Sequence, residues 1–202
     1  MTEQFHGQPL DDRAMDQIFR EARSYNGWLD KEVSDEQIEA IYDLAKMGPT
    51  SANSQPARLI WCATDVAKER LAKLASDNNK EKVRTAPVCV IIGYDIDFHE
   101  ELPWLFPHTD AKSWFEGDRD GRIEGASRNS ALQGAYLMIA ARMLGLDCGP
   151  MSGVDLDGVT KEFFADQPNV KADWICSIGY GDKSTIFDRS PRPEFEKFNR
   201  IV

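Results

Sequence analysis

The longest helical stretch of the sequence, residues 125–144, constrains the fold most. Small and apolar side chains lie around much of its circumference: Ala126, Ala131, Leu132, Gly134, Ala135, Leu137, Met138, Ala140, Ala141 and Leu144. A helix that is apolar all round has to be buried, because water would otherwise contact its apolar side chains. The stretch is therefore either a central core helix or a subunit interface, and the chain must fold around it.

The other segments alternate between helical and strand patterns. Apolar residues at helical spacing predict a helix over 16–23, and a second helix that Ser34 and Gln37 open as a capping box and Gly48–Pro49 ends. The remaining predicted elements are strands over 58–63, 87–94, 146–151 and 174–179, and helices over 64–76 and 156–164. Taken alone, this alternation indicates a doubly wound parallel sheet.

Two segments fit neither pattern. Residues 95–121 are aromatic, charged and irregular, and a segment of this length without periodicity is usually functional or a lid. Residues 180–202 carry little core of their own, but their three phenylalanines favour wrapping over another surface. No repeat, low-complexity tract or linker divides the chain, so we expect residues 1–202 to form one domain.

The charge balance argues against several classes of partner. Lys plus Arg is 24 and Asp plus Glu is 34, which gives a formal net charge of −10 with no basic run. Nucleic acid and anionic membrane surfaces are therefore not expected as partners. No apolar stretch is long enough to span a bilayer, and residues 1–17 lack the apolar region of a signal peptide. We therefore expect a cytoplasmic protein.

The cysteines and histidines predict no metal centre. The cysteines lie in separate apolar runs without a CxxC motif, and we expect buried, unpaired thiols at Cys62, Cys89, Cys148 and Cys176. The three histidines are scattered and show no ligand spacing. His108 lies beside Asp110 and could form an acid–base pair with it, although an exposed loop histidine is the alternative interpretation.

Two segments carry polar groups suited to a phosphate or a polar ring, although neither GxGxxG nor a Walker A sequence occurs. Arg23 and Ser24 follow the first predicted helix, and the guanidinium fork of arginine matches phosphate oxygens. In the run 48–56, two prolines frame short hydroxyl and amide side chains that can contact a polar ring. An ordinary polar helix end and a plain turn are the respective alternatives.

Two further segments are weak motifs when taken singly. Residues 79–82 read Asn-Lys-Glu-Lys, and residues 149–153 read Gly-Pro-Met-Ser-Gly. The glycines of the second segment allow the backbone to approach a flat ring closely. The order of the four segments along the chain, with Pro191–Arg192 near the end, is more informative than any one of them.

That order resembles the nitroreductase family of flavoproteins, over nearly the whole chain from about residue 18 to residue 198. The resemblance implies an α+β, nitroreductase-like fold with a mixed, mainly antiparallel sheet flanked by helices, in an intertwined homodimer. Residues 125–144 would lie at the dimer interface, residues 180–202 would wrap the partner, and residues 95–121 would form a lid or insert. FMN would bind at the interface, with NADPH or NADH as reductant.

The resemblance also implies individual roles. The FMN phosphate would be held by Arg23, Ser24, Arg192 and, less closely matched, Asn26. The other subunit would supply Pro49, Thr50, Ser51, Asn53 and Gln55. The flavin ring would lie beside Asn79, Lys82, Pro150, Met151, Ser152 and Gly153. Lys82 would favour the negative charge that reduction places on the ring, in a site shielded from water. No residue is implied as the proton donor, because the cofactor carries the difficult step.

Several runs resemble one branch of that family more closely, the malonic semialdehyde reductases of pyrimidine degradation. The runs cover residues 22–28, 48–53, 105–115, 128–130 and 145–153. This resemblance implies reduction of malonic semialdehyde to 3-hydroxypropionate with NADPH. The candidates for holding the substrate carboxylate are Arg128, Lys112 and His108, each of which could equally be structural or solvated. A general nitro or quinone reductase and a flavin-binding protein without turnover are the alternatives.

Overall fold

A four-stranded antiparallel sheet forms the centre of the molecule in the computed structural model, which describes residues 7–202. The strands lie in the order β1-β2-β4-β3 and comprise β1 (Ala57–Cys62), β2 (Val88–Asp95), β3 (Asp147–Met151) and β4 (Val170–Gly179). Residues 1–6, part of the stretch considered for a signal peptide, lie outside the described residues.

Strand direction decides between the two fold classes that the sequence suggested. All three strand pairs of the sheet are antiparallel, so the doubly wound parallel sheet is wrong and the α+β fold is confirmed. Direction depends on how each connection crosses the sheet, and local periodicity does not encode that crossing. A parallel contact occurs only as an isolated bridge between Ser24 and Cys148 within the described residues.

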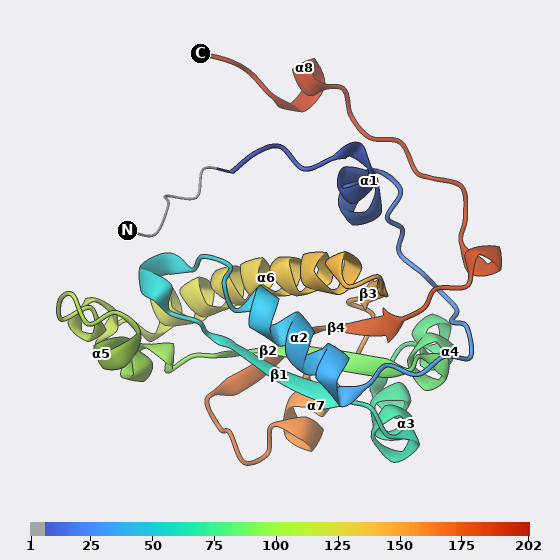
Figure 1. The fold of residues 1–202 in the computed structure, drawn as a ribbon. Coiled ribbons are helices and arrows are strands. Elements are labelled where there is room, and N and C mark those ends of the chain that lie inside the picture. Colours follow the sequence, from blue (N-terminus) through green and yellow to red (C-terminus); the bar gives the residue numbers. More distant parts are fainter. Residues whose placement is uncertain (1–6) are drawn as a thin grey trace.

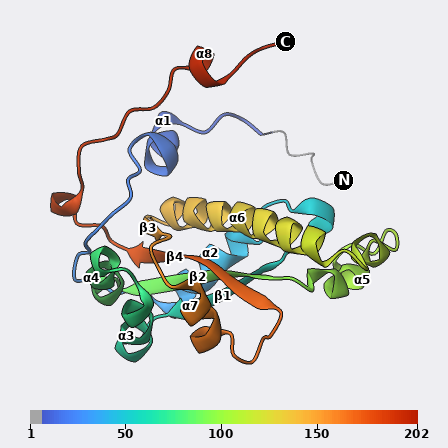
Figure 2. The same ribbon diagram turned by 180° about the vertical axis from the view of Figure 1, so that it is seen from behind.

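Helices cover both faces of this sheet (Figure 1; Figure 2). One face packs against α2 (Asp35–Ala45) and α6 (Arg119–Met143), and the other against α3 (Asp65–Leu74), α4 (Asp77–Thr85) and α7 (Leu156–Phe163). The alternation of side chains along β2 divides the core accordingly. Val88, Val90 and Ile92 join the first cluster, whereas Cys89 and Ile91 join the second.

Local capping explains where two of the helices begin. The Ser34 hydroxyl accepts a hydrogen bond from the Gln37 amide (3.3 Å), and the Gln37 side chain accepts one from the Ser34 amide (3.1 Å). The predicted capping box of α2 is therefore confirmed. Thr64 opens α3 in a similar way, because its hydroxyl accepts a hydrogen bond from the Ala67 amide (3.2 Å).

Two helices differ from the prediction. The first begins earlier, as α1 (Asp12–Met15), and continues as a π-helical turn (Asp16–Arg20) that ends before residue 23. The second, α4, was not predicted, although it carries residues 79–82. Its sequence is almost entirely polar and only Val83 is buried, so it shows no apolar periodicity that could reveal a helix.

The long helix α6 begins at Arg119, six residues before the predicted start at Gly125. One face is buried against the sheet, where Gly134 allows close approach because a Cβ there would overlap the Trp174 ring. The opposite face leaves apolar side chains in solvent, including Leu132 and Met143, which are 47% and 49% exposed. The helix is thus a core helix on one side and carries an unpartnered apolar face on the other.

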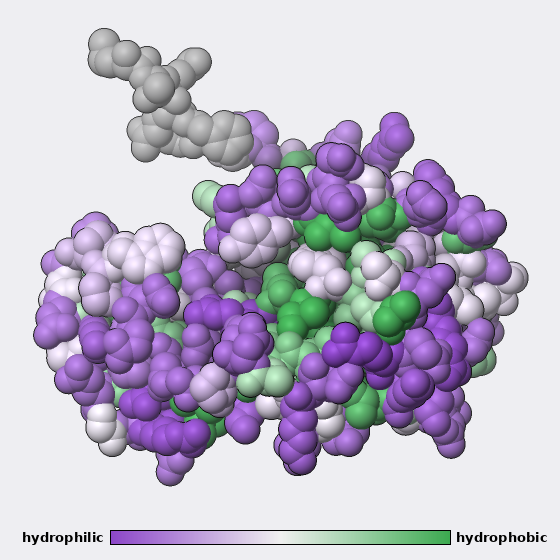
Figure 3. Space-filling view, turned by 90° about the horizontal axis from the view of Figure 1, so that it is seen from below, coloured by the Kyte–Doolittle hydropathy of each residue, from purple (hydrophilic) through white to green (hydrophobic). Residues whose placement is uncertain are grey.

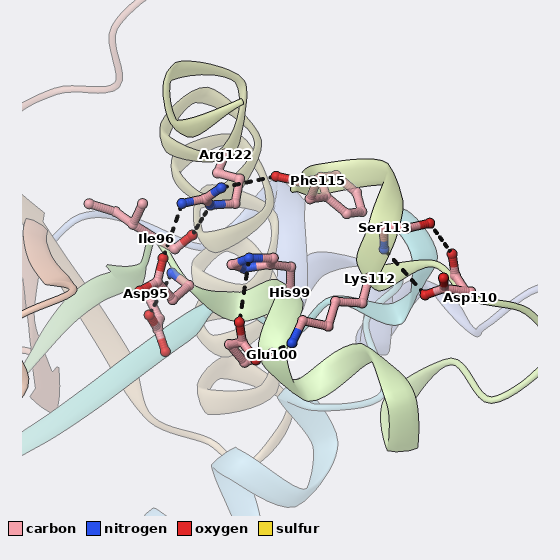
Figure 4. Close-up of polar contacts among 10 residues, drawn as sticks. Asp95, Ile96, His99, Glu100, Asp110, Lys112, Ser113, Phe115 and Arg122 are labelled. Carbon is pink, nitrogen blue, oxygen red and sulfur yellow. Dashed lines mark hydrogen bonds and ion pairs between the residues drawn. The ribbon is translucent and has the colours of Figure 1, made fainter. Parts of the chain in front are cut away.

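The segment 95–121 is ordered by short helices and a small core of its own. It contains 3-10 turns at Phe98–Glu101 and Lys112–Phe115 and the short helix α5 (Leu102–Leu105). Arg122 ties its two ends together, because the guanidinium donates to the carbonyl oxygens of Ile96 (3.2 Å) and Phe115 (3.0 Å) (Figure 4). Its role as a lid stays a prediction.

The C-terminal tail extends away from the sheet on the side of α1 (Figure 1; Figure 2). It contains a 3-10 turn at Lys183–Thr185 and the short helix α8 (Phe195–Phe198). Residues 187–202 are exposed, and the Phe187 side chain is 83% exposed. Apolar side chains also gather on the underside of the molecule, surrounded by polar ones (Figure 3).

The four cysteines are buried, as predicted, and all four are free thiols. Burial raises the pKa of the Cys62 thiol to about 11 and that of Cys89 to about 12. Across residues 7–202, no group of three or more His, Cys, Asp or Glu side chains is arranged to hold a metal ion. None of the helices in that range is long and apolar enough to cross a membrane.

Candidate functional site

The predicted site residues fall into two groups at opposite ends of the molecule. The loop between α2 and β1 lies at one end, beside α5 and the first half of α6, while α4 and β3 lie at the other end (Figure 1; Figure 2). These groups also flank opposite edges of the sheet, because β1 and β3 are its two edge strands. Four strands span roughly 15 Å across the hydrogen-bonding direction.

The first group begins with the segment 23–26, which runs along the edge strand β3. The Tyr25 amide donates to the Cys148 carbonyl oxygen (3.0 Å), and the Asn26 side chain donates to the Thr185 carbonyl oxygen (3.0 Å). Arg23 is partly buried and its guanidinium donates to the Phe187 carbonyl oxygen (2.5 Å). The backbone of this segment is therefore fixed between β3 and the start of the tail.

Asn79 and Gly153 meet where α4 approaches the end of β3. The Asn79 side-chain amide donates to the Gly153 carbonyl oxygen (3.1 Å), which also accepts a hydrogen bond from the Ser76 amide (2.9 Å). A Cβ at Gly153 would lie 2.7 Å from Asn79 Nδ2 and 2.8 Å from Ser76 Oγ. Only glycine therefore fits here without moving its neighbours.

Lys82 lies one turn after Asn79 on α4, so the two side chains share one helix face. Its side chain is partly buried and forms no ion pair with any residue of the range 7–202. Its neighbours differ, because Lys80 pairs with Asp77 and Arg84 pairs with Glu69. The Lys82 ammonium therefore has no acidic partner among the described residues, and it lies one helical turn from Asn79, which contacts Gly153.

Two acidic groups near this end have raised pKa values. Burial raises the pKa of Asp147, while the hydrogen bond from the Gly181 amide to its carboxylate (3.0 Å) partly opposes that rise. Burial also raises the pKa of the Tyr25 hydroxyl, and the negative charge of Asp147 adds to the effect. Both shifts arise mainly from burial of these two side chains beside β3.

The second group is the loop 48–56, whose backbone is strained. Ala52, Asn53 and Gln55 have φ values of 50°, 50° and 43°, and these are all the non-glycine residues with positive φ among residues 7–202. The left-handed region is unfavourable for residues with a Cβ, and such outliers gather at functional sites where the surrounding structure enforces them. The predicted ring-contact loop is thus the strained part of the chain.

Side chains of α6 hold this loop in place. The buried Asn129 side chain accepts a hydrogen bond from the Ser51 amide (2.8 Å) and donates one to the Gly125 carbonyl oxygen (2.8 Å). One turn later, the Gln133 side chain accepts from the Ala57 amide (2.9 Å) and donates to the Gln55 side chain (2.6 Å). Asn129 and Gln133 together form a clamp on the loop.

The loop is also joined to the segment 95–121 and borders a cavity. The Asn53 side chain donates to the Leu105 carbonyl oxygen at the end of α5 (2.8 Å). Asn53 and Gln55 line a cavity of about 470 Å³ that Trp104 of α5 and Arg58 of β1 also border. Residues 95–121 therefore contribute directly to the hollow beside the loop.

A comparison of the whole sequence with known protein families decides which family the chain belongs to. The Nitroreductase family model matches residues 19–182 of the chain, which include the loop, α4 and β3. The chain belongs to the nitroreductase family. Both groups of site residues lie inside this match, except Arg192 in the tail.

Relatives and solved structures agree with this membership. A Stenotrophomonas maltophilia protein named "Putative NADH dehydrogenase/NAD(P)H nitroreductase" is 52% identical over 193 residues, covering 96% of this chain and 98% of the relative. A Ralstonia nicotianae protein of the same name type is 51% identical with the same coverage. The structure of a nitroreductase-named protein of Exiguobacterium sibiricum in complex with FMN has a TM-score of 0.83 at 21% identity, covering 96% of this chain and 99% of that one. Because the identity is only 21%, the likeness to this last structure shows the fold alone.

The three residues that were predicted to hold the substrate carboxylate lie in different surroundings. Arg128 is exposed on α6 and pairs with Glu124. Lys112 pairs with Glu100 at 2.6 Å within the segment 95–121 (Figure 4), so its charge is already neutralised. His108 is exposed and stands edge-on to the Phe106 ring at 5.2 Å. The structure does not bring the three together.

Arg192 is also apart from the group that it was predicted to join. Its guanidinium donates to the carbonyl oxygens of its neighbours Ser190 and Pro191, whereas Arg23 contacts Phe187. Another arginine of the tail, Arg189, contacts the residue before Arg23: its guanidinium donates to the Ala22 carbonyl oxygen (3.1 Å). Among residues 7–202, Arg192 makes no hydrogen bond to the segment 23–26.

The clamp residues Asn129 and Gln133 were not predicted from the sequence. Asn129 is 7% exposed and Ser130 is fully buried, although the surrounding helix face is otherwise made of small and apolar residues. A buried amide in such a face needs a partner, because an unpaired polar group is costly to bury. Polar residues at positions 129 and 133, four apart on α6, were the signal that could have revealed the clamp.

Proposed function

We propose that the protein is an FMN-dependent NAD(P)H oxidoreductase. The contact between Asn79 and Gly153, with the uncommitted Lys82 one turn away, carries this proposal. A lysine ammonium suits a flat ring that gains negative charge, and Gly153 lets the Asn79 side chain approach the backbone at the end of β3. The names of the relatives and the FMN complex of the Exiguobacterium sibiricum protein support it. When bound, FMN supplies hydride acceptance from NAD(P)H and hydride donation to a substrate.

The residues of the chain would bind and orient this cofactor. Arg23 and Ser24 would hold the phosphate with a guanidinium and a hydroxyl, and Asn26 would fix their backbone through its bond to Thr185. Asn79 would orient the ring, and Lys82 would stabilise negative charge on it. Beside the ring lie the residues at the end of β3: Pro150, Met151, Ser152 and Gly153.

We further propose that the complete site forms between two copies of the chain. The loop with Pro49, Thr50 and Ser51 lies at the other end of the molecule from Asn79 and Lys82. The two groups therefore do not meet within one copy of the chain. A two-fold dimer can bring the loop of one copy to α4 of the other. The exposed apolar face of α6 and the exposed phenylalanines of the tail offer the surface for such an assembly.

The proposed reaction is the reduction of malonic semialdehyde in pyrimidine degradation. The aldehyde carbon gains a hydride and its oxygen a proton, giving 3-hydroxypropionate, while NAD(P)H becomes NAD(P)⁺. The close resemblance of residues 105–115 and 145–153 to that branch supports this substrate. The second candidate is a general nitro or quinone reductase, which the names of the relatives favour. A cytoplasmic location stays part of the proposal.

An anaerobic absorbance titration of the purified protein tests this proposal. NADPH is added until the flavin absorbance bleaches, and malonic semialdehyde is then added. Recovery of the oxidised spectrum is the expected result. Bleaching that recovers only with a nitroaromatic or a quinone would favour the second candidate. A flavin that NADPH and NADH both fail to bleach would indicate a flavin-binding protein without turnover, and a protein that does not bind FMN would overturn the proposal.

A further inference from the structure

We propose that the groove between α3 and α7 binds the 2′-phosphate of NADPH, with Lys73 and Lys161 as its anchors. The two helices lie side by side below the sheet (Figure 1; Figure 2), and the groove between them measures about 300 Å³. Its lining residues are Arg70, Lys73, Leu74, Gly158, Lys161 and Glu162. This inference rests on the proposed function and deepens it, because it selects NADPH over NADH as the reductant.

The lining side chains give the groove an excess of positive charge. Three of them are cations and one is a carboxylate, so their net charge is 3 − 1 = +2. Arg70 donates to the Glu162 carboxylate (2.6 Å), and this pair accounts for the acid of the groove. The ammonium groups of Lys73 and Lys161 form no ion pair or hydrogen bond with any residue of the range 7–202.

The acids one helical turn away do not neutralise these two lysines. Glu69 precedes Lys73 by four residues on α3, but its carboxylate is bound by Arg84 of α4 (2.7 Å). Asp157 precedes Lys161 by four residues on α7, and no ion pair joins their side chains. Residues 65–84 carry six Lys or Arg and four Asp or Glu, a net charge of 6 − 4 = +2 in a chain of net charge −10. This region therefore attracts a phosphate dianion that the rest of the surface repels.

The shape of the groove leaves its floor open to a ligand. Gly158 lies on the floor, where a Cβ would come within 2.7 Å of Leu74 Cδ2. Glycine thus lets α7 pack closely on α3 and adds no side chain to the hollow. The two helices cover the sheet face opposite to α6. The groove therefore stays accessible in a dimer that buries the exposed face of α6.

Backbone contacts join the groove to the proposed flavin site. The Asp155 amide donates to the Leu74 carbonyl oxygen (2.8 Å), and the Ser76 amide donates to the Gly153 carbonyl oxygen (2.9 Å). Gly153 is proposed to lie beside the flavin ring, and Lys161 lies roughly 8 Å along the axis from the start of α7. A dinucleotide with its nicotinamide at the ring can place its other ribose here. A cationic side chain beside that ribose is what accommodates a 2′-phosphate in nucleotide-binding proteins.

A larger cavity nearby is less suited to a phosphate. It measures about 620 Å³ and lies between the segment 28–33 and α3. Its two cations are engaged, because Lys31 lies over the Tyr180 ring (3.6 Å) and Lys68 donates to the Ala86 carbonyl oxygen (3.0 Å). Its lining also includes three carboxylates, those of Asp30, Glu32 and Asp65. The smaller groove thus combines free cations with a low number of acids.

Binding of two matched probes to the FMN-loaded protein tests the inference by isothermal titration calorimetry. The probes are adenosine 2′,5′-bisphosphate and adenosine 5′-monophosphate, which lacks only the 2′-phosphate. We expect the bisphosphate to bind more tightly. Lys73→Gln and Lys161→Gln should each weaken its binding roughly fivefold, because an exposed charge pair is lost, and leave the monophosphate unchanged. Glu162→Gln should tighten bisphosphate binding a few fold, because it removes a like charge.

Lys171→Gln is the matched control, because it removes one exposed ammonium at a residue of β4 that does not line the groove. It should change binding of neither probe. Equal binding of the two probes by the wild type, or an equal effect of Lys73→Gln on both, would overturn the inference. So would inorganic phosphate that binds as tightly as the bisphosphate, because the groove would then be a site for the free ion.

The same variants separate this inference from the proposed function. Bisphosphate binding that depends on Lys73 and Lys161, in a protein whose flavin NADPH does not bleach, supports the groove and contradicts the proposed reductase. Bleaching by NADPH with a KM that both variants leave unchanged supports the reductase and overturns the groove. The expected result is a roughly fivefold higher KM for NADPH in each variant, with the KM for NADH and both kcat values unchanged.

Discussion

The two ends of the molecule present their polar groups in different ways. At the loop 48–56 the backbone is unusual and its neighbours are committed, because the clamp residues Asn129 and Gln133 bond to it from α6. At the α4–β3 end the backbone is ordinary, and Lys82 and Arg23 have no acidic partner among residues 7–202, although Arg23 donates to the Phe187 carbonyl oxygen. One end therefore contributes shape through a strained backbone, and the other contributes positive charge that no internal carboxylate neutralises.

The difference indicates that the two ends have different roles within one site. A strained loop needs support, since each left-handed residue with a Cβ costs about 1–2 kcal/mol, and the clamp provides that support. A charged side chain needs freedom from internal partners, because an existing ion pair would compete with the ligand. Separate variants at the two ends can test whether stability and cofactor affinity divide in this way.

The largest effect is expected at the charged end. Arg23→Gln should weaken FMN binding roughly thirtyfold, because a guanidinium–phosphate hydrogen bond contributes about 2 kcal/mol. Stability of the FMN-free protein should change little, since the guanidinium has a single bond to the Phe187 carbonyl oxygen. Fluorescence titration with FMN and urea unfolding measure the two effects. Arg20→Gln is the control, because within residues 7–202 Arg20 pairs only with exposed acids and with Met15.

Unchanged FMN affinity in Arg23→Gln would contradict the assignment of the phosphate to the segment 23–26, and so would an equal loss of affinity in the Arg20→Gln control. An Arg23→Gln variant that loses stability and affinity together would instead make Arg23 a structural tie to the tail.

At the strained end, Asn129→Leu should lower the free energy of unfolding by about 1–2 kcal/mol. The change removes the acceptor for the Ser51 amide and the donor to the Gly125 carbonyl oxygen. FMN affinity should fall as well, because the loop loses one arm of its clamp. Urea unfolding and FMN titration would be compared for the same preparations.

Ser130→Ala is a matched control for this variant. The Ser130 hydroxyl is fully buried next to Asn129 and donates to the Gly93 carbonyl oxygen (3.1 Å), but it does not contact the loop. Its loss should lower stability by about 1 kcal/mol without changing FMN affinity. Equal losses of affinity in both variants would show that the clamp acts only through general stability.

Backbone strain itself is tested at Ala52, whose φ is 50°. Ala52→Gly should raise the free energy of unfolding by about 0.5–1 kcal/mol, because relief of the left-handed strain outweighs the opposing entropy that the unfolded chain gains. Gly145→Ala is the opposite change at the end of α6, where φ is 79°, and it should destabilise by a similar amount. An Ala52→Gly variant that is less stable than the wild type would mean that the loop is not strained.

The smallest effect concerns Asp147 at the charged end, whose pKa is raised by burial. The folded protein therefore holds that proton more tightly than the unfolded chain, and stability falls as the pH rises from the ordinary pKa of an aspartate through the raised value. Asp147→Asn should be more stable than the wild type at neutral pH by less than about 1 kcal/mol. The difference should vanish in urea unfolding at a pH below the ordinary pKa, and a difference that persists there would contradict this cause.

Particular residues show which parts of the fold could be predicted. The capping box of Ser34 and Gln37 and the buried strand 87–94 are local signals, and both are confirmed within one residue. The helix α4 could not be predicted, because its residues are polar and tertiary packing of Val83 against the sheet stabilises it. The same helix carries Asn79 and Lys82, so sequence order identified these residues without the element that positions them.

The sequence by itself determined the features that short-range physics controls: the capped starts of α2 and α3, the apolar strands, the buried cysteines and the order of the polar segments. The tertiary structure alone decided the antiparallel direction of the strands, the left-handed backbone at Ala52 and the clamp from Asn129. These features depend on contacts between residues that are far apart in the chain, such as Ser51 with Asn129 and Asn79 with Gly153. No local pattern encodes them, because each partner alone is an ordinary polar residue.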